Sequence, residues 1–249
     1  MIHFIGAGSG AADLITLRGK TLLEQADIII YAGSLVNPEL LSYAKKDAKI
    51  YNSAEMTLDE VIDVMERGRE KNIARLHTGD PSIYGAIREQ MDRLDALNIE
   101  YDICPGVSSF CGAAASLKAE YTLPDVSQTV IITRMEGRTG VPEKEKIHLL
   151  ASHGATMVIF LSASMTKELG EELIRGGYSE KTPAAIVYKA TWADEKILRC
   201  TVGTLHDTAV KNNIRKTALI TVGDFLGDDY SLSKLYDKSF TTEFRKGQE

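Results

Sequence analysis

Residues 73–85 read Ile-Ala-Arg-Leu-His-Thr-Gly-Asp-Pro-Ser-Ile-Tyr-Gly, and this stretch decides the fold more than any other part of the chain. A short apolar run from Ile73 to Leu76 leads into a turn that starts at Gly79, and a helical pattern follows. Gly79 can adopt backbone angles that other residues avoid, and Pro81 fixes the direction in which the chain leaves the turn. In open parallel sheets, ligands bind outside the carboxyl ends of the strands. The stretch therefore predicts a strand, a ligand-binding turn and a helix.

Strand-like and helix-like segments alternate on both sides of this stretch. In the first half they are 3–5, 17–25, 27–31, 38–44, 49–51, 58–69, 73–77, 84–97 and 101–103. This rhythm is typical of a mainly parallel sheet with crossover helices. Thr57 and Glu60 have the spacing of a capping box, which predicts that a helix begins there.

A second α/β pattern begins after a polar segment that contains Pro124. Its segments are 129–133, 157–161, 167–174, 184–188, 197–201 and 219–222, and we expect 197–201 to be antiparallel. We place the domain boundary between residues 122 and 123. The fold prediction is thus two α/β domains, 1–122 and 123–249, each with a mainly parallel mixed sheet, and an active-site cleft between them.

Composition narrows the class of protein. The chain has 249 residues, 44% of them hydrophobic, and a net charge of -6, which gives no basic field for nucleic acid. No apolar run reaches the roughly 18 residues of a membrane span, and the first residues lack the pattern of a secretory leader. We therefore expect a cytoplasmic protein that binds neither nucleic acid nor membrane. The three cysteines and five histidines lack the spacing of a metal site, so no protein-bound metal is expected.

A glycine-rich loop, Gly-Ala-Gly-Ser-Gly-Ala at residues 6–11, follows the first predicted strand. It nearly matches the dinucleotide fingerprint, so an NAD-type oxidoreductase is one hypothesis. That site also needs an acid after the second strand, where Ala32-Gly33-Ser34 stand instead, and the helix expected at Gly10 is delayed by residues 13–17. A tight turn that lines a ligand site and a plain strand-to-helix crossover both remain open.

Four motifs together resemble the tetrapyrrole methylase family, the S-adenosylmethionine-dependent enzymes that modify corrin and sirohaem precursors. They are Gly6-Ala7-Gly8-Ser9-Gly10, Ala26-Asp27-Ile28-Ile29-Ile30-Tyr31, Gly79-Asp80-Pro81-Ser82-Ile83-Tyr84-Gly85 and Pro105-Gly106-Val107-Ser108-Ser109. With the strands of the second half, the resemblance covers about residues 1–225. It implies a C-methyltransferase that is a homodimer and acts on a tetrapyrrole, with S-adenosylmethionine as cosubstrate.

Residues 31–36 and 134–139 are similar to the branch that methylates C11 of precorrin-4 or cobalt-precorrin-4 in cobalamin biosynthesis, and we favour the cobalt form. The uroporphyrinogen-III branch has an Asp and a basic residue where this chain has Ala32 and Asn52. Methylation of another precorrin carbon or another acceptor remains the alternative within this fold.

The resemblance also implies site residues. Donor binding is expected from Thr78, Gly79, Asp80, Ile83, Ser108 and Ser109, and from Leu161, Ala185 and Ala218 in the second domain. Substrate binding is expected from Gly8, Ser9, Tyr31, Ser34, Arg134 and Arg138. A sulfonium methyl donor has an excellent leaving group, so transfer needs mainly alignment. The catalytic residue is unknown; Glu136 and Glu195 are conceivable bases. Arg134 and Arg138 suit carboxylates, although arginines beside Glu136 can equally form a solvated charge cluster.

Overall fold

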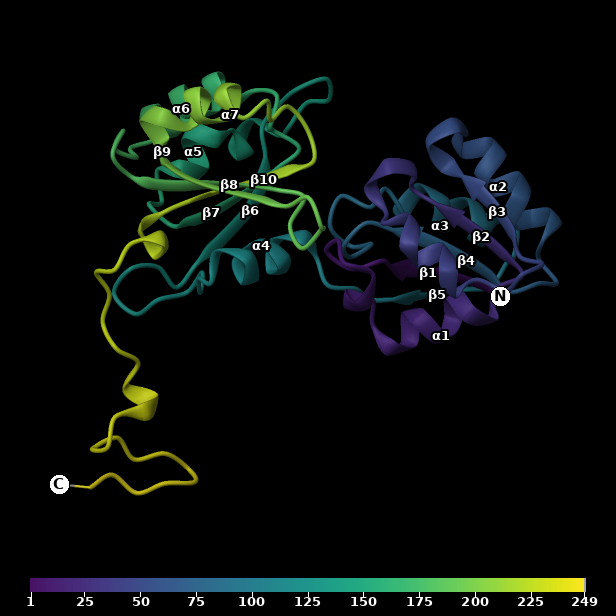
Figure 1. Cartoon of the computed structure of the whole chain (residues 1–249), viewed down its shortest axis with the longest axis horizontal. Helices are drawn as coiled ribbons and strands as arrows, with labels where there is room; N and C mark the ends of the chain where they lie inside the picture. Colours follow the sequence, from purple (N-terminus) through teal and green to yellow (C-terminus); the bar gives the residue numbers. More distant parts are fainter. Residues whose placement is uncertain (249) are drawn as a thin grey trace. The chain divides into compact units, whose positions relative to one another are not determined.

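The computed structural model describes residues 1–248, with the side chain of Ser34 outside the described part. The chain divides into two compact units. The N-terminal unit comprises Met1–Ala113 together with Lys189–Glu195, and the C-terminal unit comprises Ala114–Tyr188 and the chain from Lys196 onward. Figure 1 shows a twisted sheet with helices in each unit. The boundary expected between residues 122 and 123 stays a prediction.

The N-terminal unit holds a five-stranded parallel sheet in the order β3-β2-β4-β1-β5. Its strands are β1 (Ile2–Gly6), β2 (Ile28–Tyr31), β3 (Lys49–Asn52), β4 (Ile73–His77) and β5 (Tyr101–Cys104). Its helices are α1 (Leu17–Gln25), α2 (Leu58–Arg67) and α3 (Arg88–Ala96), and α4 (Ser109–Leu117) runs from this unit into the next. The predicted alternation is confirmed.

Helices cover both faces of this sheet. Residues of α2 and α3, such as Val61 and Leu94, pack with Phe4 on one face, whereas Leu23 of α1 packs with Ile5 on the other. The capping box of Thr57 and Glu60 is present at the start of α2. One helix start was predicted wrongly. The pattern placed it at residue 84, but α3 begins at Arg88 because the chain first makes a tight turn.

The strand order places a topological switch at β1 and β4, which are neighbours. From β1 the chain crosses to β2 on the far side of β4, and from β4 it crosses to β5 on the far side of β1. The connections therefore leave the two strands in opposite directions. Ligands of such sheets bind at this point, outside the carboxyl ends of the strands.

The C-terminal unit holds a second five-stranded sheet in the order β6-β7-β10-β8-β9. Its strands are β6 (Val130–Arg134), β7 (Thr156–Phe160), β8 (Pro183–Tyr188), β9 (Lys196–Thr201) and β10 (Ala218–Val222). Its helices are α5 (Ile147–Ala151), α6 (Thr166–Arg175) and α7 (Leu205–Lys211), which lie together on one face while α4 lies on the other (Figure 1). The expected fold class, two α/β domains, is confirmed.

One feature of this sheet differs from the expectation. Only β6 and β7 pair in parallel; β10 pairs antiparallel with both β7 and β8, and β9 is antiparallel to β8. Strands β6, β7 and β8 do run the same way, as their helical crossovers require. Since β10 inserts between β7 and β8 in the opposite direction, the second sheet is mixed rather than mainly parallel. The antiparallel direction expected for 197–201 is confirmed.

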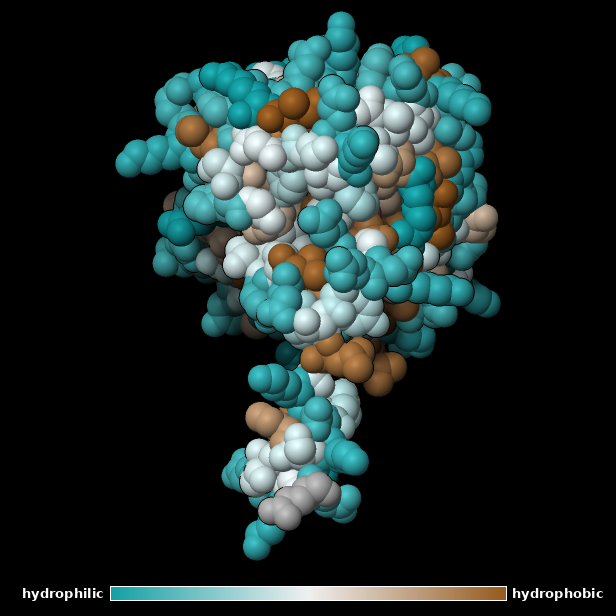
Figure 2. Space-filling model, turned by 90° about the vertical axis from the view of Figure 1, so that its left-hand side faces the viewer, coloured by the Kyte–Doolittle hydropathy of each residue, from teal (hydrophilic) through white to brown (hydrophobic). Residues whose placement is uncertain are grey.

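The C-terminal segment after β10 is organised by its own contacts. The guanidinium of Arg245 donates to the carbonyls of Leu235, at 2.9 Å, and Asp237, at 2.6 Å. Hydrophobic groups interrupt the otherwise hydrophilic surface on this segment and on the body (Figure 2), and Leu232, Tyr236 and Phe244 are among the exposed ones. Among the helices of residues 1–248, none combines the length and the apolar character that a membrane span requires.

Candidate functional site

Three loops meet at the carboxyl edge of the N-terminal sheet, and glycines form their contact. A Cβ placed on Gly106 would lie 2.2 Å from the carbonyl oxygen of Gly79 and 2.6 Å from the Cα of Gly6. These three residues follow or end β5, β4 and β1. Because no side chain fits there, the floor of the site consists of backbone groups that lie unusually close together.

Two of the loops are paired through their backbones. The amide of Gly79 donates to the carbonyl of Gly8 at 3.0 Å, and the amide of Gly8 donates back at 3.3 Å. Both glycines have left-handed angles, with φ of 83° at Gly8 and 62° at Gly79. Only glycine adopts this region at little cost, so the pair fixes the loops after β1 and β4 to each other.

Asp80 ties the third loop to this pair. One of its carboxylate oxygens accepts from the amide of Gly106 at 2.8 Å, and the other accepts from the amide of Ser82 at 2.8 Å and from its hydroxyl. Burial raises the pKa of the carboxyl, but these hydrogen bonds outweigh it, so the pKa is held below its usual value. Asp80 is therefore an ionised loop clamp, with both oxygens engaged in the protein.

The N-terminal unit brings together the donor residues that the sequence predicted there. A Cβ on Gly79 would lie 3.2 Å from the amide nitrogen of Ser109 and 3.3 Å from the Cα of Ser108. Ser108 is buried, and Thr78 donates its hydroxyl to the carbonyl of Leu35 in the loop after β2. Ile83 is half-buried in the turn that follows Asp80. Apart from Asp80, this group carries no charge.

The glycine-rich loop does not present a helix N-terminus to a ligand. After Gly10 the chain makes a short 3-10 turn, Ala12–Leu14, and α1 starts only at Leu17, where Thr16 caps it. The delayed helix that the sequence predicted is confirmed. This loop therefore lacks the aligned helix dipole that holds a pyrophosphate in dinucleotide sites.

A residue that the sequence did not indicate, Thr191, joins the glycine-rich loop. Its hydroxyl oxygen accepts from the amide of Ala11 at 3.0 Å and lies 3.2 Å from the hydroxyl of buried Ser9. Thr191 belongs to the segment between β8 and β9, which joins the N-terminal unit, and has a left-handed φ of 67°. No sequence signal pointed to it, because a threonine in a hairpin carries no motif.

Two other substrate candidates lie at the same edge of the sheet. Tyr31 ends β2 and is half-buried, and its carbonyl accepts from the hydroxyl of Ser53 at 3.0 Å. The side chain of Ser34 lies outside the described part of the chain. Glu195, a candidate base, accepts from the amide of Thr191 at 2.6 Å, so its carboxylate supports this hairpin. Its role as a base stays a prediction.

The arginine loop after β6 belongs to the C-terminal unit. The guanidinium of Arg134 donates to the carbonyls of Thr139, at 3.1 Å, and Gly140, at 2.6 Å, and thereby holds the loop that follows its own strand. Arg138 and Glu136 are exposed on that loop. The two arginines are thus placed differently, because Arg134 is bound to its loop and Arg138 faces solvent.

The remaining donor candidates also lie in the C-terminal unit. Leu161 directly follows β7, has a left-handed φ of 53° and exposes 65% of its surface. Ala218 starts β10 and pairs with Tyr188 at the end of β8. Ala185 lies further inside β8 and is fully buried. Leu161 and Ala218 therefore lie at the same edge of the second sheet, and Ala185 lies within it.

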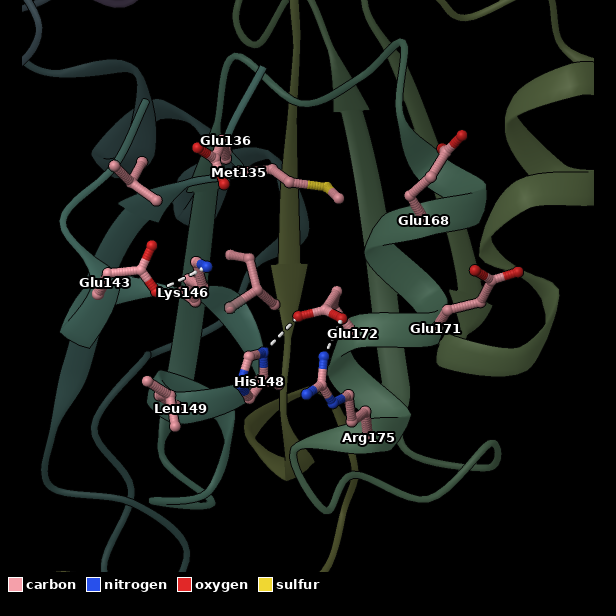
Figure 3. Close-up of a pocket in the computed structure, with 12 residues that line it drawn as sticks. Met135, Glu136, Glu143, Lys146, His148, Leu149, Glu168, Glu171, Glu172 and Arg175 are labelled. Carbon is pink, nitrogen blue, oxygen red and sulfur yellow. Dashed lines mark hydrogen bonds and ion pairs between the residues drawn. The ribbon is translucent and has the colours of Figure 1, made fainter. Parts of the chain in front are cut away.

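A cavity of about 640 Å³ opens in the C-terminal unit, between α5, α6 and the arginine loop (Figure 3). Five glutamates line it: Glu136, Glu143, Glu168, Glu171 and Glu172. Its basic groups are already paired, since Lys146 contacts Glu143 at 2.7 Å and Arg175 contacts Glu172 at 3.2 Å. The excess negative charge repels carboxylates, so the cavity does not suit a ligand that carries several of them.

Comparisons with known proteins agree with the resemblance seen in the sequence. A sequence model of the family described as Tetrapyrrole (Corrin/Porphyrin) Methylases matches residues 1–206. A cobalt-precorrin-4 C(11)-methyltransferase from Methanocaldococcus jannaschii is 57% identical over 98% of this chain and 96% of its own length. A precorrin-4 C(11)-methyltransferase from Pseudomonas aeruginosa is 40% identical over 99% of each chain. A solved cobalt precorrin-4 methyltransferase, described as a cobalamin biosynthetic enzyme, has a TM-score of 0.89 and 49% identity, covering 91% of this chain and 96% of its own.

Proposed function

Because this chain belongs to the tetrapyrrole (corrin/porphyrin) methylase family, we propose that it transfers the methyl group of S-adenosylmethionine to C11 of cobalt-precorrin-4. The observation that carries this proposal is the full-length similarity to proteins named for that reaction. The relative from M. jannaschii and the solved structure are both named for the cobalt-containing substrate, and both are more similar to this chain than the relative named for precorrin-4. That difference supports the cobalt form.

The site at the carboxyl edge of the N-terminal sheet fits an adenosyl donor. Gly6, Gly79 and Gly106 bring no side chains into this site, so backbone groups of the three loops can serve the adenine and the amino-acid end of the donor. We propose that Thr78, Gly79 and Asp80 contact it through their backbones. The slot that would hold the donor is lined by Ile83, Ser108 and Ser109 in this proposal. The proposed contacts from the C-terminal unit are Leu161, Ala185 and Ala218.

The proposed mechanism asks the protein chiefly for alignment. When bound, S-adenosylmethionine supplies an electrophilic methyl group on a sulfonium that leaves as a neutral thioether. The paired loops at Gly8 and Gly79 hold the backbone contacts rigid, and the Asp80 carboxylate keeps Gly106 in register with them. Such fixed groups lower the entropic cost of bringing the methyl into line with a ring carbon.

The substrate is a polycarboxylate tetrapyrrole, and we propose that Gly8, Ser9, Tyr31 and Ser34 contact the macrocycle. Arg138, exposed on its loop, is the proposed partner of a carboxylate, and Arg134 acts by fixing that loop. For a base that accepts the C11 proton, Glu136 is the candidate to test first, because Glu195 already holds the hairpin. By its family we also propose a homodimer, which light scattering on the purified protein tests.

The experiment is an incubation of the purified protein with methyl-labelled S-adenosylmethionine, with precorrin-4 and cobalt-precorrin-4 offered side by side. Mass spectrometry counts the methyl groups gained, and NMR locates them. One labelled methyl at C11, formed faster with the cobalt substrate, is the expected result. A methyl at another carbon would overturn the C11 assignment and keep the family, whereas saturable binding of NAD without binding of S-adenosylmethionine would overturn the methyltransferase.

A further inference from the structure

Three buried polar side chains lie beneath the turn at residues 81–87, which directly follows the proposed donor-binding residues Gly79 and Asp80. Arg75 and His77 come from β4 and Gln90 from α3, and they expose only 7%, 4% and 5% of their surfaces. Buried polar side chains of this size are uncommon unless they are hydrogen-bonded. All three belong to the N-terminal unit, next to Gly79 and Asp80, yet none is among the residues assigned to the donor site.

Two of these side chains, Arg75 and Gln90, form a chain of hydrogen bonds that ends on the turn. Arg75 donates from Nε to Oε1 of Gln90 at 3.1 Å, and Gln90 donates from Nε2 to the carbonyl of Ala86 at 2.9 Å. His77 lies close to the backbone of Gly85, and its Nε2 has no hydrogen-bond partner in the described part of the chain. The turn is therefore held at Ala86 by a hydrogen bond from a buried side chain, and His77 packs near the preceding residue.

The turn requires such support because its backbone is strained. Tyr84 and Ala86 have left-handed φ angles of 55° and 49°, which non-glycine residues rarely adopt. Gly85 between them has no room for a side chain, since a Cβ there would lie 2.1 Å from the carbonyl oxygen of Pro81. Strained residues persist only where surrounding contacts determine their conformation. Here those contacts come from Gln90 and His77.

The charge of this group resides on Arg75. Burial lowers the pKa of Arg75 to about 10, so the guanidinium stays protonated at neutral pH. Burial, followed by repulsion from Arg75, lowers the pKa of His77 to about 3, which leaves its imidazole neutral. The other hydrogen bonds of Arg75 go to the carbonyls of Ile30 and Leu76. A cation on the oxygen side of the Gln90 amide polarises that amide and strengthens the hydrogen bond to Ala86.

We infer that Gln90, oriented by Arg75, is a positioning residue that locks the turn at residues 81–87 and thereby holds Gly79 and Asp80 in the geometry that binds the methyl donor. The inference rests on the proposed function, since it assumes that this motif binds S-adenosylmethionine. Gln90 does not contact the donor. It acts through the carbonyl of Ala86, at the opposite end of the turn from the Asp80 clamp.

The variant Gln90→Glu separates this role from simple stabilisation. A glutamate keeps the acceptor for Arg75 and adds a charge pair there, so the fold is retained. It has no N–H to offer Ala86, and two oxygens then face each other. The matched control is Glu89→Gln, an exposed exchange of the same two residue types on the same helix. Calorimetry gives the dissociation constant for S-adenosylmethionine and the thermal midpoint, and hydrogen exchange reports on the amides of residues 82–87 without any donor.

For Gln90→Glu we expect a dissociation constant raised about tenfold, the size of one lost hydrogen bond between neutral groups. The KM for the donor should rise by the same factor while kcat changes less than about twofold, as for a lost binding contact. Amides 82–87 should exchange faster, and the control should match the parent protein. Unchanged amide exchange would overturn the inference whether or not the donor binds, and so would unchanged donor affinity in a protein whose parent binds it. A parent protein that fails to bind S-adenosylmethionine overturns the proposed function instead, and the exchange result still decides whether Gln90 locks the turn.

Discussion

Gly6 and Gly106 approach each other so closely that a Cβ on Gly6 would lie 2.5 Å from the Cα of Gly106. The same Cβ would lie 2.7 Å from the carbonyl oxygen of Gly79. Three loops of the N-terminal unit thus touch through backbone atoms, and these atoms are not able to move aside as a flexible side chain would. The donor site that we propose depends on this contact, because the distance between the loops would set the width of the slot.

Gly106→Ala should therefore separate the loops. Its methyl group would meet two backbone atoms at 2.2 and 2.6 Å, and overpacking of this kind costs about 1–3 kcal/mol of stability. We expect a loss of that size in urea denaturation and a larger relative loss of S-adenosylmethionine affinity in calorimetry. Gly140→Ala is the control, since the nearest atom there is the end of the Glu136 side chain at 3.6 Å. Equal donor affinity in the folded Gly106→Ala protein would contradict this account of the slot.

Asp80→Asn tests the clamp between the loops. The substitution replaces one acceptor oxygen with an amide NH2 group, which faces an N–H group of either Gly106 or Ser82, so one of the two loop contacts is lost. Donor affinity should fall about tenfold, the size of one hydrogen bond to a charged group. Because the folded pKa of Asp80 is lowered, its contribution to stability is present above the unfolded pKa of 3.8 and is lost as the pH falls through the folded pKa.

Measurements of stability from pH 6 to pH 2 should show the loss of the Asp80 contribution in the parent protein, and this loss should be missing in Asp80→Asn. Asp47→Asn, at an exposed position, should keep both the donor affinity and the acid dependence of the parent protein. An Asp80→Asn protein that binds the donor normally would mean that the carboxylate serves stability alone.

The first sheet and the turn at Gly79 could be predicted from the sequence, because residues that are adjacent in the chain determine both. The strand from Ile73 to His77 and the turn at Gly79 follow from adjacent residues, and Gly79 has the left-handed angle that its glycine predicted. The second sheet was only partly predictable. Alternation predicts the direction of β6, β7 and β8 correctly, but it does not reveal that β10 inserts between two of them.

Other features of the site were beyond sequence reasoning for a physical reason. The helix predicted from residue 84 starts at Arg88, because Tyr84 and Ala86 adopt left-handed angles that no apolar pattern predicts for non-glycine residues. Ser9 and Thr191 are separated by 182 positions, so no local pattern joins them. The sequence also treated Arg134 and Arg138 alike, whereas backbone carbonyls bind the first and leave the second exposed.

His77 should make the protein more sensitive to acid. Its pKa is about 3 in the folded protein and 6.5 when exposed, because burial and then Arg75 disfavour the charged ring. The unfolded chain therefore binds a proton that the folded chain excludes, and stability falls as the pH drops from about 6.5 toward 3, by up to about 1.4 kcal/mol per pH unit. His77→Gln is less stable than the parent at pH 7, and this difference should shrink on going to pH 5. The control is His153→Gln, at an exposed position, and its difference in stability from the parent protein should be the same at pH 7 and pH 5.

Thr191→Val tests the hairpin that joins the glycine-rich loop. Valine has the shape of threonine, but it offers no acceptor to the amide of Ala11 and no partner to the hydroxyl of Ser9. Leaving a fully buried N–H unsatisfied costs about 1–3 kcal/mol, and the amide of Ala11 is partly buried, so we expect a loss of stability at or below the lower end of that range, with a higher KM for the tetrapyrrole at nearly constant affinity for S-adenosylmethionine. Thr21→Val on the surface of α1 is the control. A rise in donor KM instead would place this hairpin on the donor.

We expect Arg134→Gln to affect the stability of the protein and Arg138→Gln to affect the KM for the tetrapyrrole. Arg134 holds two carbonyls of its own loop, so its replacement should loosen the loop and reduce the stability of the protein. Arg138 is exposed, and its replacement should leave stability and donor affinity unchanged while the KM for the tetrapyrrole rises several-fold at low ionic strength. That rise should shrink as salt is added, because salt screens an exposed charge pair. Arg215→Gln, also exposed, controls for net charge. If the KM effect of Arg138→Gln matches that of Arg215→Gln at every salt concentration, Arg138 does not bind a substrate carboxylate.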